Sequence, residues 1–75
     1  MELTVKDLIQ ALSKYPPNTR VLVQGYEGGY SDVQDAREIP VAFNVNKEDY
    51  MGPHDDDENS KQTAIVLIRD LNRNK

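Results

Sequence analysis

Ala64-Ile65-Val66-Leu67-Ile68 is the stretch of sequence that decides the fold. It contains five consecutive apolar residues, too few for a buried helix, and three of them are β-branched. Such a run is typical of a strand that is buried inside a sheet. The sequence therefore predicts a strand over residues 63–71, and this strand is the best candidate for the centre of the sheet.

Two further strands precede it. The run Arg20-Val21-Leu22-Val23-Gln24 is short, rich in β-branched residues and bounded by Gly25, which predicts a strand over residues 20–24. Residues 38–46 alternate apolar with mostly polar positions, the period of a strand that has one buried face. Pro40 cannot donate to a ladder, so it should lie at an edge or face outward. The long linkers favour antiparallel or mixed pairing over tight hairpins.

An amphipathic helix opens the chain. Thr4 is a good N-cap, Asp7 stands where a capping box carries an acid, and Pro16 stops the helix. The apolar positions repeat with a helical period and form one stripe: Val5, Leu8, Ile9 and Leu12. We predict a helix over residues 5–14.

These elements predict an α+β fold with the order α-β-β-β. One N-terminal helix should pack on a three-stranded, mainly antiparallel sheet in a two-layer single domain spanning residues 1–75. Leu22 and alternate residues of the last strand must then point away from the helix, because side chains alternate along a strand. An uncovered apolar face indicates a partner. We therefore expect a homodimer or a higher oligomer.

Length and composition exclude several classes of protein. The chain has 75 residues, 37% of them hydrophobic, and no cysteine, which removes disulfide frameworks, thiol nucleophiles and cysteine-based zinc sites. No apolar run is long enough to span a membrane and no signal peptide is evident, so we expect a cytoplasmic protein without membrane contact. The net charge of −4 makes nucleic acid an unlikely partner.

The stretch from Gly25 to Asp32 combines glycines with two tyrosines. Glycines allow positive φ and close backbone approach, while tyrosines offer flat faces and hydroxyl groups. The segment suits a binding loop, although a plain turn that covers the sheet edge is the alternative. It matches neither a P-loop nor a dinucleotide fingerprint. The candidate binding residues are Tyr26, Glu27, Gly28, Gly29, Tyr30 and Asp32.

A second candidate segment is acidic. Residues 27–58 hold ten acids against Arg37 and Lys47, a balance of −8, and we expect residues 52–62 to form a flexible acidic loop and residues 72–75 a frayed tail. The loop is either solvated or able to bind a cation or a partner, but it lacks the spacing of a calcium-binding loop. We assign no metal site and no cofactor. The candidate binding residues here are Tyr50, His54, Asp55, Asp56 and Asp57.

The helix-to-strand start, with Thr4-Val5-Lys6-Asp7-Leu8-Ile9, Pro16-Pro17 and Val21-Leu22-Val23, is followed by Gly25-Tyr26-Glu27-Gly28-Gly29-Tyr30. With these motifs the sequence resembles a family of small uncharacterised bacterial and phage proteins. The resemblance implies a genomic setting and no activity, and no catalytic residue is carried over from it.

These features predict a non-enzymatic accessory protein that acts as an inhibitor or an adaptor. Action against a host defence system is one role that such a protein can have. It would bind a host or bacterial protein through the acidic middle segment and the Gly/Tyr loop. One alternative is an oligomer that binds a nucleotide-like small molecule with that loop. A further alternative is a metal-dependent enzyme that uses His54 and carboxylates.

Overall fold

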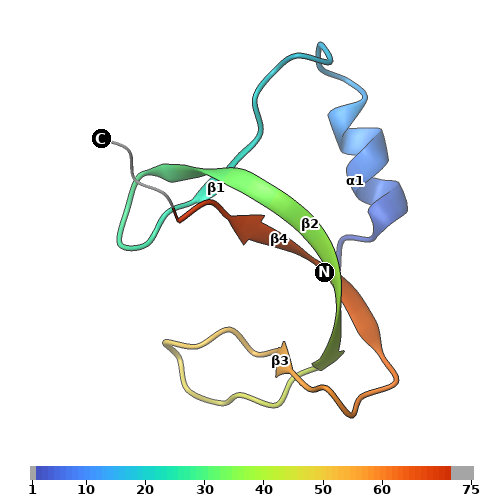
Figure 1. The fold of residues 1–75 in the computed structure, drawn as a ribbon, viewed down its shortest axis with the longest axis vertical. Coiled ribbons are helices and arrows are strands. Elements are labelled where there is room, and N and C mark those ends of the chain that lie inside the picture. Colours follow the sequence, from blue (N-terminus) through green and yellow to red (C-terminus); the bar gives the residue numbers. More distant parts are fainter. Residues whose placement is uncertain (1, 72–75) are drawn as a thin grey trace.

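The architecture is an N-terminal helix followed by a mainly antiparallel sheet of four strands, which confirms the α+β class. A computed structural model describes residues 2–71, so the predicted tail at 72–75 lies outside the described residues. Figure 1 shows the arrangement of the elements. Their bounds are α1 Val5–Leu12, β1 Leu22–Gln24, β2 Tyr30–Ala42, β3 Asp55–Asp56 and β4 Thr63–Arg69.

Strand β2 organises the sheet, because each of the other three strands pairs with it and none of them pairs with another in the described part of the chain. β4 runs along one edge of β2 for most of its length. The prediction of a central last strand was therefore wrong, as was the prediction of three strands. The two-residue β3 adds the fourth strand in the segment that we expected to be a loop.

The bounds of β2 differ most from the prediction of a strand over residues 38–46. β2 begins eight residues earlier because β1 pairs with residues 30–32 and β4 pairs with the mostly polar stretch from Val33 to Glu38, which has no apolar alternation of its own. It ends at Ala42 because Asn44 adopts a positive φ of 59° and turns the chain out of the ladder. The residues between β1 and β2 also form a short hairpin loop over 25–29, where we expected a long linker.

Pro40 fits this central strand because of the direction in which its nitrogen points. The neighbouring Val41 N–H donates to the carbonyl of Gln62 at 3.0 Å, whereas the Pro40 carbonyl accepts from Asp57 N–H, at 3.1 Å, on the other side of β2. Consecutive residues of a strand face opposite edges. The missing N–H of Pro40 thus lies on the edge opposite β4, and the β2–β4 ladder loses no hydrogen bond.

The predicted capping box of the helix is confirmed. The Asp7 backbone N–H donates to Thr4 Oγ1 at 3.2 Å, and Asp7 Oδ2 accepts from the Thr4 backbone N–H at 3.1 Å. The pKa of the Asp7 carboxyl is lowered below its usual value. The main cause is the hydrogen bond from the Thr4 backbone N–H, and a smaller one is the hydrogen bond that the Thr4 hydroxyl donates to the same carboxylate. The helix ends at Leu12, two residues before the predicted end, with Ser13 as its C-cap.

The helix does not bury its apolar stripe on the sheet of its own chain. α1 contains no buried residue, and the ribbon stands beside β2 rather than against it (Figure 1). A turn closed by Thr19 N–H and the Pro16 carbonyl, at 3.1 Å, follows the helix, and the two prolines fix the backbone there. This stiff connection carries α1 away from β1, so the predicted packing of the helix on the sheet is absent from the single chain.

The core is correspondingly small. Among the described residues only Val41 is buried, at 5% exposed, and it lies where β2 passes between β3 and β4. A domain of this size normally relies on several fully buried side chains. The stability of this part of the sheet should depend on Val41 more than on its neighbours.

We expect Val41→Ala to lower the free energy of unfolding by about 2 kcal/mol, because it removes buried methyl groups and leaves a void. Val45→Ala is the matched control, since Val45 lies four residues further on and is 50% exposed; its effect should stay within about 0.5 kcal/mol. Urea denaturation at one fixed protein concentration measures both. Equal losses for the two variants would show that Val41 is not the core of this sheet.

Candidate functional site

The Gly/Tyr loop, residues 25–30, is a tight β-hairpin connection between β1 and β2. Gly25 N–H donates to the Gly29 carbonyl at 3.0 Å and closes the loop. Glu27, Gly28 and Gly29 all have positive φ, of 64°, 139° and 66°. Such values favour glycine, and the two glycines supply most of the left-handed backbone that the turn requires.

The closed loop requires glycine at position 25 for a different reason, because there is no room for a Cβ atom. A Cβ atom at this position would lie 2.7 Å from the carbonyl oxygen of Gly28, closer than real Cβ contacts. That oxygen belongs to the backbone of the same closed loop, so it cannot move away as a flexible side chain would. The absence of a side chain at Gly25 therefore allows the loop to fold back on itself.

Next to this loop lies a hollow of about 420 Å³. We call it the loop hollow, and it is formed where the β1–β2 connection meets the end of β4. Both tyrosines border it and remain largely exposed, Tyr26 at 78% and Tyr30 at 75%. The residues that line it are Gly25, Tyr26, Gly28, Gly29, Tyr30, Ser31, Asp32, Arg69, Asp70 and Leu71.

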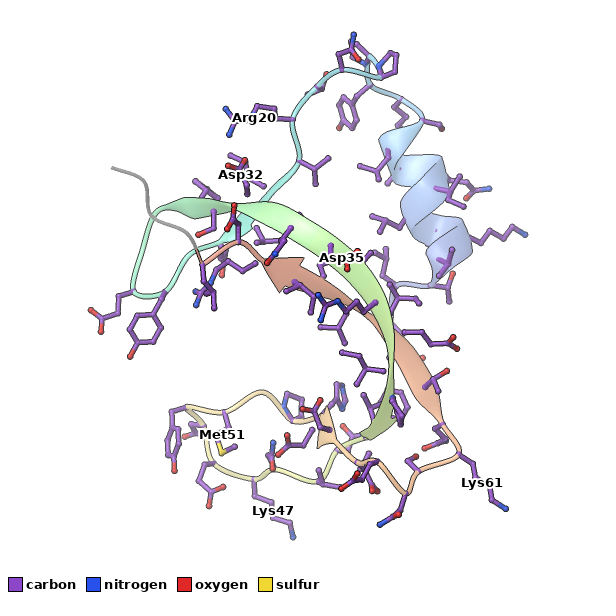
Figure 2. All side chains as sticks on the ribbon, viewed as in Figure 1. Arg20, Asp32, Asp35, Lys47, Met51 and Lys61 are labelled. Atoms are coloured by element: carbon purple, nitrogen blue, oxygen red, sulfur yellow. The ribbon has the colours of Figure 1, made fainter. Side chains whose placement is uncertain are left out.

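The charges around the loop hollow are only partly neutralised. Asp32 Oδ1 accepts from Arg20 Nη2 at 2.6 Å, and the two side chains point toward each other in Figure 2. This hydrogen bond, together with the charge of Asp32, raises the pKa of Arg20. Because both side chains are more than half exposed, the pair contributes little to stability and serves to hold the chain before β1 against β2.

Arg69 is the cation that the pairing of β4 with β2 brings to this site. It lies opposite Val33 in the ladder, is half-buried, and has no ion pair or hydrogen bond to its side chain among the described residues. The backbone N–H groups of Gly28 and Gly29 also have no acceptor within the described residues. An unpaired guanidinium and two free N–H donors at one hollow can receive an anionic or carbonyl-bearing group.

His54 has a structural contact at the other end of β2. Its Nδ1 accepts from the Asn44 backbone N–H at 3.0 Å, and its ring meets Phe43 edge-on with the centroids 5.1 Å apart. These contacts close the base of the loop that joins β2 to β3. Within residues 2–71 no carboxylate forms an ion pair or a hydrogen bond with His54.

The carboxylates of the acidic segment serve local turns rather than a shared site. Asp55 Oδ1 accepts from the Asp56 N–H at 2.9 Å, and Asp57 Oδ1 accepts from the Asn59 N–H at 3.0 Å. Asp55 and Asp56 are consecutive in β3, so their side chains face opposite sides. In the described part of the chain no three acidic, histidine or cysteine side chains are grouped as metal ligands.

The structure thus divides the predicted site residues into two separate groups. Tyr26, Gly28, Gly29, Tyr30 and Asp32 line the loop hollow, whereas Glu27 belongs to the loop but not to the lining. The second group lies beyond the opposite end of β2 and does not line the loop hollow: Tyr50, His54, Asp55, Asp56 and Asp57.

The candidate binding residues included neither Gly25 nor Ser31, although both lie in the stretch from Gly25 to Asp32, and sequence reasoning missed Arg69, Asp70 and Leu71 at the hollow. For Gly25 and Ser31, adjacency to the named residues was a usable signal. The other three depend on the register between β4 and β2, which joins residues far apart in the chain and has no local signature.

Comparison with known proteins gives no relative, because no family model, no curated protein and no solved structure matches the chain. Of the helices in residues 2–71, none has the length and apolar character needed to cross a membrane.

We expect Gly25→Ala to destabilise the fold by about 1–3 kcal/mol, the usual range for forcing extra atoms into a filled space. Gly52→Ala is the matched control, because a Cβ there meets nothing within 4 Å and its φ is not left-handed. The control should change stability by less than about 0.5 kcal/mol. Thermal denaturation followed by circular dichroism compares the two. A neutral Gly25→Ala variant would contradict the closed loop described above.

Proposed function

We propose that this chain is a non-enzymatic binding protein that contacts a host or bacterial protein through the Gly/Tyr loop. The observation that carries the proposal is the pair of exposed tyrosines beside the hollow: Tyr26 and Tyr30 directly follow Gly25 and Gly29, the two residues whose hydrogen bond closes the loop. Tyrosine supplies a large amphipathic contact area with few rotatable bonds, which is why it is enriched in binding surfaces. Such residues are frequent hot spots when a partner covers them.

The rigidity of the loop supports the same proposal. The hydrogen bond between Gly25 and Gly29 closes the loop at its base, and the ladder between β1 and β2 continues directly from it. A preformed loop loses less conformational entropy on binding than a flexible one. Little of the favourable free energy of the tyrosine contacts would therefore be offset by the cost of ordering the loop.

The acidic middle segment has a supporting role in this proposal. Its carboxylates are spread over turns and opposite strand faces, which argues against a phosphate-like array that imitates nucleic acid. The balance of −8 over residues 27–58 still generates a negative field. Such a field raises the rate of encounter with a basic partner and weakens with salt.

Replacing both loop tyrosines, Tyr26→Ala with Tyr30→Ala, should reduce the amount of partner that is captured from a host lysate at least about tenfold, since losing about 1.4 kcal/mol already changes affinity tenfold. Tyr50→Ala is the matched control, because Tyr50 is 84% exposed and lies outside the hollow. The control should capture as much as the unmodified protein. Capture at low and high salt separates the contact of the tyrosines from the field of the acids. If Tyr50→Ala lowers the amount of captured partner and the double loop variant does not, the proposal is excluded.

A second candidate function is the binding of a small anionic molecule, such as a nucleotide, in the loop hollow. The specific observation in its favour is Arg69, which borders about 420 Å³ of space and has no partner for its guanidinium among the described residues. A tyrosine ring could stack on a base while Arg69 and the free loop N–H groups contact a phosphate.

A nucleotide that binds there should raise the melting temperature by about 10 °C or more when its concentration reaches about one hundred times its dissociation constant. Arg69→Gln should abolish the shift. Arg37→Gln is the matched control, because Arg37 pairs with Asp35 through Nε at 2.9 Å and is not part of the hollow. A thermal-shift screen with mono-, di- and triphosphates makes the measurement. No shift with any of them would leave protein binding as the only candidate.

A further inference from the structure

The chain leaves two apolar surfaces uncovered. The first, the helix stripe, consists of the exposed members of the apolar stripe of α1, Val5, Ile9 and Leu12, with Ile9 63% exposed; Leu8 is half-buried and is not counted. The second, the sheet patch, consists of Ile65 and Leu67 of β4, at 47% and 40% exposed. Ile65 and Leu67 are two residues apart in one strand and therefore share a face. An amphipathic helix and the apolar face of a sheet are the two halves of a common packing unit.

The area of the single chain shows how much surface is uncovered. Its accessible surface is 7034 Å², whereas a compact monomer of 8.5 kDa should expose about 4,650 Å². The excess is about 2,400 Å² per chain and is summed over all elements and loops, so the helix stripe and the sheet patch supply part of it. A dimer that covered the excess of both copies would bury about twice as much, within the range of obligate homodimers. The radius of gyration, 14.3 Å, also exceeds the value of about 11 Å expected for a compact domain of this length.

We propose that a second copy of this chain covers these surfaces, with the helix stripe of each copy packed on the sheet patch of the other. The exchange is reciprocal, so a single two-fold axis relates the copies and both uncovered surfaces are buried at once. The two-layer packing of helix on sheet that the sequence predicts is thereby formed between copies instead of within one.

The connection between α1 and β1 makes this exchange feasible. Residues 13–21 contain no helix or strand, and nine residues can span up to about 30 Å when extended. The turn at Pro16–Thr19 already directs the helix away from the sheet of its own chain. A helix that lies away from its own sheet can pack on the sheet of an identical subunit, and exchange of an element in this way is a low-cost route to a dimer.

A second copy suits these surfaces better than an unrelated protein. One chain carries both the helix stripe that needs a sheet and the sheet patch that needs a helix, so two copies satisfy each other without a third component. The proposal is independent of the proposed function, because the residues of the helix stripe and the sheet patch do not line the loop hollow.

Sedimentation equilibrium tests the association. The unmodified protein should sediment as a dimer, and Ile9→Asp and Leu67→Asp should each weaken dimerisation at least about a hundredfold. Gln10→Asp is the matched control, since Gln10 is exposed on α1 outside the helix stripe and should leave the dimer unchanged. Circular dichroism checks that each variant keeps its helix. A monomer at high concentration for the unmodified protein overturns the proposal.

Cysteine cross-linking tests the arrangement, because the chain contains no cysteine of its own. Ile9→Cys and Leu67→Cys are prepared separately and mixed under oxidising conditions. A disulfide-linked dimer that forms in the mixture, and not with either variant alone, supports helix-on-sheet exchange. Cross-linking of Ile9→Cys with itself indicates helix-on-helix packing and overturns it. So does a doubly substituted chain, Ile9→Cys with Leu67→Cys, that closes its disulfide within one chain.

Discussion

The antiparallel ladder between β2 and β4 is the interaction on which the rest of the structure depends. It joins residues 23 to 36 positions apart in the chain, from Pro40↔Thr63 to Val33↔Arg69, and β1 and β3 attach to β2 at the two ends of this pairing. Each of these two strands pairs over two or three residues, too few to be stable alone. The ladder therefore stabilises the strand on which the Gly/Tyr loop and the β2–β3 loop are held in position.

The same ladder builds the candidate site. A bulge at Gln34 shifts the register between Val33 and Asp35, and the pairing then continues to a hydrogen bond from Asp70 N–H to the Asp32 carbonyl at 2.9 Å. Bulges bend a strand and increase its twist. This extension brings Arg69 to the hairpin loop, so an arginine from the end of the chain faces glycines and tyrosines from its first half.

Local signals in the sequence predicted local structure well, and non-local pairing was not predictable. The capping box of Thr4 and Asp7 identified the start of the helix, and the glycines of the loop identified a turn. The first part of β2 was missed because it is polar, and its strand structure comes from pairing with β4. For the same reason the tyrosines of the site could be found from the sequence, whereas Arg69 could not.

The polar part of β2 also explains why association should use the faces of the sheet rather than this edge. Between β1 and β3 the edge of β2 opposite β4 has no strand partner in the described residues. There the Ala36 N–H donates to Asp35 Oδ1 at 2.8 Å, and Arg37 Nε donates to Asp35 Oδ2 at 2.9 Å. The hydrogen bond from Arg37 is the main cause that lowers the pKa of the Asp35 carboxyl, and the one from the Ala36 N–H adds to it, so the carboxyl stays charged. A charged side chain that occupies an edge donor blocks the addition of another strand, so the apolar helix stripe and sheet patch are the surfaces left for a second copy.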